Sequence, residues 1–88
     1  MKLIAILVLV ISTFSGPAIA QDRCARLWFE RNAVYKDAGY CFKTSRAISA
    51  FGNAGCSFDA IEDVPLSARQ REYVARIQAE ERNFHCPR

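Results

Sequence analysis

The sequence predicts a small all-α, three-helix domain with a long loop, stapled by two disulfides and preceded by a signal peptide. Three observations carry this prediction. The first 20 residues have the layout of a secretory leader. Four cysteines follow in the short remainder of the 88-residue chain. The apolar residues of that remainder recur at helical spacing, and no stretch alternates as a half-buried strand would.

The N-terminus has the three parts of a signal peptide. Lys2 is the basic part, Leu3 to Phe14 is the apolar part, and Ala18-Ile19-Ala20 is the small-x-small pattern that signal peptidase reads. We expect cleavage after Ala20, which leaves a mature domain of residues 21–88 in the periplasm or outside the cell.

Neither a membrane span nor a lipid anchor is expected. The apolar run is about 12 residues long, whereas a spanning helix needs about 20. Lipid attachment requires a cysteine directly after the cleavage site, and Gln21-Asp22-Arg23 separates that site from Cys24.

The cysteines are expected to form two disulfides. Residues 21–88 are fewer than the roughly 70–80 at which one hydrophobic core suffices, so covalent staples are needed. The mature part holds an even set of cysteines, namely Cys24, Cys41, Cys56 and Cys86. Each bridge typically contributes about 2–4 kcal/mol.

The first helix is predicted over Ala25 to Ala38. Its apolar residues form one stripe at helical spacing, namely Leu27, Trp28, Val34, Tyr35 and Ala38. Gly39 ends the helix, because glycine adopts the left-handed C′ conformation at little cost. Tyr40 would then contact Tyr35, as the C″ and C3 residues of such a cap commonly do.

The second helix is predicted from about Ser45 to Phe51, with Thr44 as the N-cap and Gly52 as the stop. Its apolar face comprises Ala47, Ile48 and Phe51. A loop from Asn53 to Pro65 follows, in which three apolar residues are expected to point inward as a lid on the core, namely Phe58, Ile61 and Val64.

The third helix is predicted to begin after Leu66. Ser67 with Gln70 forms a capping-box pattern, which satisfies two backbone donors. The buried stripe is expected to comprise Tyr73, Val74, Ile77 and Phe84, and the opposite face carries charges.

Spacing limits the disulfide pairing without fixing it. Cys24 and Cys41 lie at opposite ends of a helix about 20 Å long, so they cannot pair. Short links favour three helices that run up, down and up, which pairs Cys24 with Cys56 and Cys41 with Cys86. The long loop could instead reverse the third helix, which pairs Cys24 with Cys86 and Cys41 with Cys56.

The first helix and its exit also carry a family resemblance. The stretches LWFERNAVY at 27–35 and GYCF at 39–42 are similar to the defining motif of the YARHG domain family. Lys36, Asp37 and Ala38 stand at the central letters of that name, so its histidine is absent. The resemblance implies a small extracellular bacterial domain over nearly the whole mature chain, and it implies no particular activity.

Five residues of this motif are candidate structural or ligand contacts, namely Arg31, Asn32, Tyr35, Gly39 and Tyr40. Arg31 lies within the apolar stripe, so we expect an internal acceptor, such as a loop carbonyl, Asp59, Glu62 or Asp63. A bound carboxylate or phosphate is the alternative. Asn32 is expected to bond the backbone of a neighbouring segment.

The sequence favours a non-catalytic binding module of the bacterial envelope or periplasm, for a protein or cell-wall partner. The net charge of +3 is scattered and includes no basic run, so no nucleic-acid partner is expected. The cysteines have no C-x-x-C spacing, and adjacent His85 and Cys86 cannot easily act as a catalytic pair, so no metal, cofactor or catalytic residue is expected. A small periplasmic enzyme or an enzyme inhibitor is the alternative.

Overall fold

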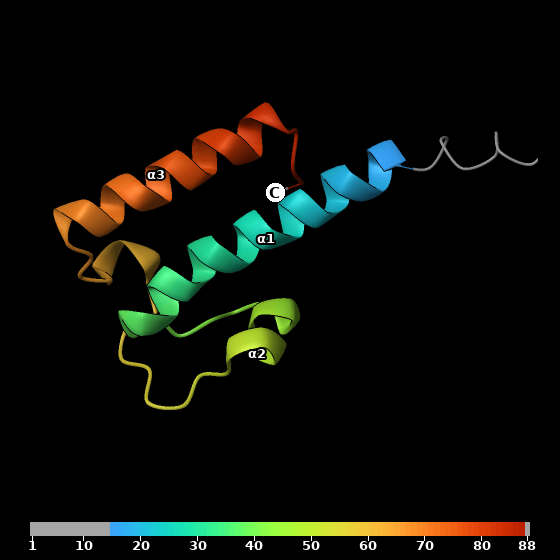
Figure 1. The fold of residues 1–88 in the computed structure, drawn as a ribbon. Helices are drawn as coiled ribbons and strands as arrows, with labels where there is room; N and C mark the ends of the chain where they lie inside the picture. The colour runs from blue at the N-terminus through green and yellow to red at the C-terminus, as the bar shows by residue number, and fades with distance from the viewer. Residues whose placement is uncertain (1–14, 88) are drawn as a thin grey trace, which may run out of the picture.

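The computed structural model describes residues 15–87, which form three α-helices, one short 3-10 helix and no extended strand (Figure 1). The helices are α1 (Ser15–Asp37), α2 (Ser45–Phe51), η2 (Ile61–Asp63) and α3 (Ala68–Asn83). This arrangement, with its long loop and two disulfides, confirms the predicted fold class. The basic and apolar parts of the predicted signal peptide, residues 2–14, lie outside the described residues.

α1 begins ten residues before the predicted start at Ala25, so that boundary was wrong. Ser15, Gly16 and Pro17, which follow the apolar part of the predicted signal peptide, lie in the first turn of α1. The first backbone N–H groups of a helix have no partner within it, so a proline is tolerated there. The helix therefore runs without a break through the predicted cleavage site after Ala20.

α1 ends as predicted, in a Schellman motif. The Tyr40 N–H donates to the Tyr35 carbonyl at 3.0 Å, and the Gly39 N–H donates to the Lys36 carbonyl at 3.1 Å. Gly39 has φ +96°, which a residue with a Cβ rarely adopts. The Tyr35 and Tyr40 rings lie edge to face at 6.1 Å, so the expected C3–C″ contact is also confirmed.

The N-termini of the two later helices were predicted correctly. The Thr44 hydroxyl accepts from the Ala47 N–H at 3.2 Å and caps α2. At α3, the Gln70 N–H donates to the Ser67 hydroxyl and the Ser67 N–H donates to the Gln70 side chain, which completes the capping box.

α3 ends in a second Schellman motif, which the sequence did not reveal because it has no glycine. The Cys86 N–H donates to the Glu81 carbonyl at 2.8 Å, and the His85 N–H donates to the Arg82 carbonyl at 3.1 Å. His85 occupies the left-handed position with φ +54°. This turn redirects the chain from α3 toward α1, where Cys86 meets Cys24.

α1 lies between the other two helices, with α3 on one side and α2 on the other (Figure 1). α3 runs antiparallel to α1, because the loop after α2 returns the chain to the C-terminal end of α1 before α3 begins. A parallel bridge between Tyr40 and Phe58 fixes that return. The Cys41 N–H donates to the Phe58 carbonyl at 2.8 Å, and the Phe58 N–H donates to the Gly39 carbonyl at 3.0 Å.

The disulfides join Cys24 to Cys86 and Cys41 to Cys56. The exclusion of Cys24–Cys41 is confirmed, but the favoured pairing of Cys24 with Cys56 was wrong. Its premise was that α2 would return the chain along α1. α2 has 7 residues against 23 in α1, so it is too short to do so. The long loop returns the chain instead, which makes α3 antiparallel to α1 and brings Cys86 beside Cys24.

Among residues 21–87, the core is formed by one buried residue from α1, one from α2, two from α3 and two from the connecting segments, namely Leu27, Ala47, Val74, Ile77, Phe42 and Val64. Four residues that were expected to face inward are exposed instead, namely Ile48, Ile61, Tyr73 and Phe84. α2 and α3 each pack on α1 and not on each other within residues 15–87. Each therefore buries only the narrow stripe that faces α1, and of the predicted lid Val64 is buried and Phe58 half-buried.

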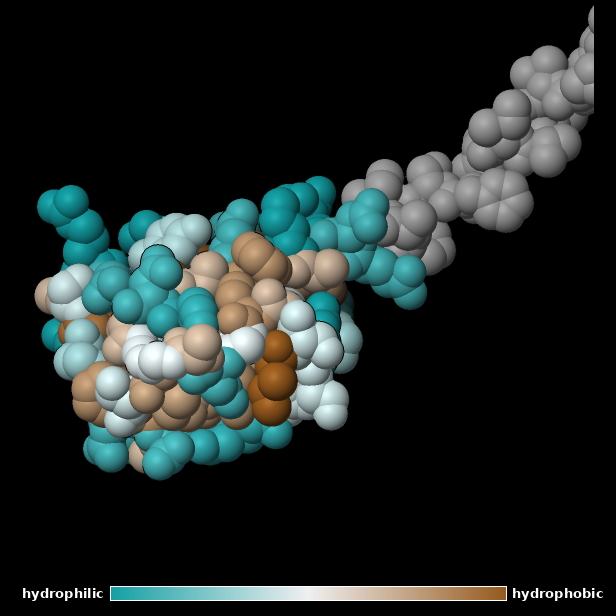
Figure 2. Space-filling view, turned by 90° about the horizontal axis from the view of Figure 1, so that it is seen from below, coloured by the Kyte–Doolittle hydropathy of each residue, from teal (hydrophilic) through white to brown (hydrophobic). Residues whose placement is uncertain are grey.

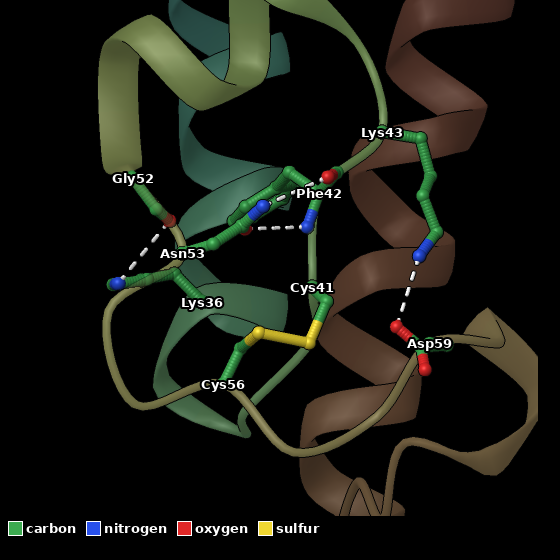
Figure 3. Close-up of a disulfide and its surroundings, with 8 residues drawn as sticks. All are labelled: Lys36, Cys41, Phe42, Lys43, Gly52, Asn53, Cys56 and Asp59. Atoms are coloured by element: carbon green, nitrogen blue, oxygen red, sulfur yellow. Dashed lines mark hydrogen bonds and ion pairs between the residues drawn. A yellow bond between two sulfur atoms is a disulfide. The ribbon is translucent and has the colours of Figure 1, made fainter.

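The start of the long loop is held against the segment that leaves α1 (Figure 3). The Asn53 side chain pairs with the backbone of Phe42 in both directions: its Oδ1 accepts from the N–H at 2.6 Å, and its Nδ2 donates to the carbonyl at 3.0 Å. The Cys41–Cys56 bridge lies beside this pair. The Lys43–Asp59 ion pair, at 3.1 Å, is exposed and adds little.

Candidate functional site

Two hollows flank the Cys24–Cys86 disulfide, where the end of α3 approaches α1. One has a volume of about 570 Å³ and the other about 330 Å³. Both are lined by Glu81, Cys86 and Pro87, so the disulfide and the turn after α3 lie between them. Pockets for small ligands have volumes of about 300–1,000 Å³.

Most side chains that line the larger hollow are polar, and two of them form an ion pair between α1 and α3. The Arg31 Nε donates to Glu81 Oε1 at 2.8 Å, and its Nη2 donates to Oε2 at 3.0 Å. The side chains are 24% and 13% exposed. An internal acceptor for Arg31 was expected, but the acceptor is Glu81 of α3, and not the loop acids Asp59, Glu62 or Asp63. Bidentate pairing uses both carboxylate oxygens of Glu81, so it fixes the register of α3 on α1.

The smaller hollow combines aromatic rings with an arginine, and a second arginine lies close by. Trp28 of α1 and Phe84 after α3 line it, together with Arg46 from the first turn of α2. The Arg46 guanidinium carbon lies 3.8 Å from the centre of the Trp28 ring. The Arg23 guanidinium carbon lies 4.2 Å from the centre of the Phe84 ring. A guanidinium over an aromatic face is attracted by the ring electrons.

Trp28 also belongs to a continuous aromatic cluster, which we define as Trp28, Phe29, Tyr35, Tyr40, Phe42 and Phe51. Phe51 is at its centre, with ring centres 6.0 Å from Trp28, 4.8 Å from Phe29 and 5.2 Å from Phe42. Phe29 is half exposed at the edge of the cluster. Figure 2 views the α2 side and shows apolar surface between hydrophilic residues there. Trp28 therefore packs against this cluster, and the packing holds the Trp28 side chain in place in the wall of the smaller hollow.

The structure does not gather the five predicted contact residues into one site. Arg31 lines the larger hollow, whereas Tyr35, Gly39 and Tyr40 form the helix end at the opposite end of the domain. Asn32 donates from its Nδ2 to the Trp28 carbonyl at 2.9 Å, which lies one turn earlier in α1. The expectation that Asn32 bonds a neighbouring segment was wrong, because the backbone of its own helix provides the nearer acceptor.

Sequence reasoning missed Glu81 and Arg46. Glu81 follows the buried Val74 and Ile77 at i+7 and i+4, so helical spacing places it on the face of α3 that meets α1. Each long helix thus carries one charge of opposite sign in its apolar stripe, and this pattern is readable in the sequence. Arg46 had no such signal, because its contact with Trp28 depends on where α2 packs.

No cluster of three or more metal-ligating side chains is found among residues 15–87. Within the same range, no helix is both long and apolar enough to cross a membrane.

The fold and its covalent cross-links define a class of protein: a small all-α domain held together by two disulfides. The family model of the YARHG domain matches residues 5–82, and the chain belongs to this family. No curated protein sequence and no solved structure matches the chain.

Proposed function

We propose that this protein is an exported, non-catalytic binding module of the bacterial envelope or periplasm, and that its binding surface is the smaller hollow at the Cys24–Cys86 bridge. The observation that carries the proposal is the wall of that hollow, where the Arg46 guanidinium lies over the Trp28 ring. The aromatic cluster and the disulfide hold this wall in place. A pre-organised surface binds at low entropic cost.

The acid beside the hollow supports binding over catalysis. Glu81 is the only carboxylate among the described residues that line either hollow. Both of its oxygens accept hydrogen bonds from Arg31, so it holds α3 on α1 and is poorly placed to act as a general base.

Export is supported by the two disulfides, because such bonds persist in oxidising compartments. It is also supported by Ala18-Ile19-Ala20 and by what the YARHG resemblance implies. We expect the protein isolated from a bacterial host to have the mass of residues 21–88 with two disulfides. An intact Met1 or a lipid adduct on Cys24 would contradict export by this route.

The binding function is tested by capture from periplasmic and cell-wall fractions. The baits are the wild-type domain, Arg46→Glu and the matched control Arg69→Glu, which makes the same charge change at an exposed position near the other end of α3. We expect one partner to be enriched on the wild type and on the control, and lost on Arg46→Glu. Equal recovery on all three baits, or no recovery beyond an unrelated disulfide-bonded domain, would contradict the proposal.

A further inference from the structure

We infer that the smaller hollow recognises a carboxylate attached to an apolar group. This inference rests on the proposed function and names the chemistry of its ligand. The carboxylate belongs either to a free small acid or to the C-terminal residue of a peptide. Both sources present the same groups to the protein, and the experiment below separates them.

Arg46 provides the positive charge. It is exposed, its guanidinium carbon lies over the Trp28 ring, and its guanidinium makes no hydrogen bond or ion pair with any residue of the described chain. Arg31 pairs with Glu81, Lys43 pairs with Asp59, and Arg71 donates to the Leu66 carbonyl. Several surface arginines, like Arg46, have no such partner among the described residues, but of these only Arg46 lines the smaller hollow. No N–H group of this guanidinium donates to a described residue, so these groups remain available, and their geometry matches a carboxylate.

The charges around the hollow do not neutralise Arg46. The one carboxylate among the described lining residues, Glu81, is already paired with Arg31. Arg23 adds a second positive charge over the neighbouring Phe84. If cleavage occurs after Ala20, the new α-amino group belongs to Gln21, which also lines the hollow. A cleft in which positive charge is in excess favours an anionic ligand.

The other residues that line the smaller hollow indicate that the ligand also has an apolar group. Ala25, Phe84, Pro87 and the Cys24–Cys86 disulfide provide apolar contacts. Guanidinium groups already lie over the rings of Trp28 and Phe84, so these rings do not present both faces to a sugar. The volume of about 330 Å³ lies at the lower end of the range for small-ligand pockets. The hollow therefore suits a compact acid with one apolar side chain.

The test is a titration of the isotopically labelled mature protein, followed by NMR through the Trp28 indole N–H and the backbone amides of Ala25 and Arg46. The probes are N-acetyl-phenylalanine, its neutral amide, and the tripeptide acetyl-Ala-Ala-Phe with a free C-terminus. The proteins are the wild type, Arg46→Gln and the matched control Arg69→Gln.

We expect both acids to shift these resonances and the amide to leave them unchanged. Arg46→Gln should weaken binding of the acids at least tenfold, and Arg69→Gln should change it less than twofold. Tighter binding of the tripeptide assigns the ligand to a peptide terminus, and equal binding assigns it to a free acid.

Equal binding of the acid and the amide, or an unchanged dissociation constant for Arg46→Gln, would overturn the inference. If no probe binds while the captured partner still depends on Arg46, the carboxylate assignment fails and the proposed function stands. If no probe binds and no partner depends on Arg46, both fail.

Discussion

At the scale of single residues, the Arg31–Glu81 pair is the polar side-chain contact whose loss should matter most. Each side chain is more than three-quarters buried, and each satisfies the other through two hydrogen bonds. Removal of one partner leaves a half-buried charge without compensation, which costs more than the pair itself contributes.

We therefore expect Glu81→Gln to lower the free energy of unfolding by about 1–3 kcal/mol. Arg31→Met, which keeps an apolar side chain of similar length and removes the charge, should also destabilise the domain while partner binding is retained. Urea unfolding of both single variants and of the double variant measures the coupling. Additive effects of the two substitutions would show that the pair makes no specific contribution.

Asn53 is a second residue with a defined role, because its amide pairs with both backbone groups of Phe42. Asn53→Asp keeps the oxygen that accepts from the Phe42 N–H, but it replaces the donor with a charged oxygen that faces the Phe42 carbonyl. We expect a loss of about 1–2 kcal/mol in the free energy of unfolding. Lys36→Met, which removes the weaker 3.4 Å bond to the Gly52 carbonyl, is the control and should change stability by less than half as much. Equal losses would contradict this role of Asn53.

At the scale of elements, the features that could be predicted from the sequence are those that depend on residues close together in the chain. The caps at Thr44 and Ser67 and the exit of α1 at Gly39 depend on residues within a few positions, and all three were predicted correctly. The exposure of Phe84 and the contact of Arg46 with Trp28 depend on packing between distant segments. No local pattern encodes them, so the candidate site was not predictable from the sequence.

Among the helix ends, the turn at His85 after α3 should have the clearest effect on the free energy of unfolding. His85 holds the left-handed position of the Schellman motif after α3, where a side chain with a Cβ is strained by about 1 kcal/mol or more. We expect His85→Gly to raise the free energy of unfolding by about 0.5–1 kcal/mol, and His85→Val to lower it, because β-branched residues tolerate this conformation least. Thermal unfolding of the two variants decides this. A glycine variant less stable than the wild type would show that contacts of the histidine side chain outweigh the strain.

At the scale of the whole molecule, the path of the long loop determines both the fold and the candidate site. The bridge between Tyr40 and Phe58 returns the chain to the C-terminal end of α1, so α3 runs back along α1 and ends beside Cys24. Both hollows exist because of this antiparallel arrangement. Under an up-down-up order, Cys86 would lie at the other end of the domain and neither hollow would form.

Peptide mapping of the non-reduced mature protein tests this arrangement most directly. Trypsin separates the four cysteines into peptides 24–26, 37–43, 47–69 and 83–88. We expect mass spectrometry to find 24–26 joined to 83–88 and 37–43 joined to 47–69, as the Cys24–Cys86 and Cys41–Cys56 bridges require. A disulfide that joins 24–26 to 47–69 would contradict the antiparallel arrangement of α1 and α3, and with it the position of the proposed binding site.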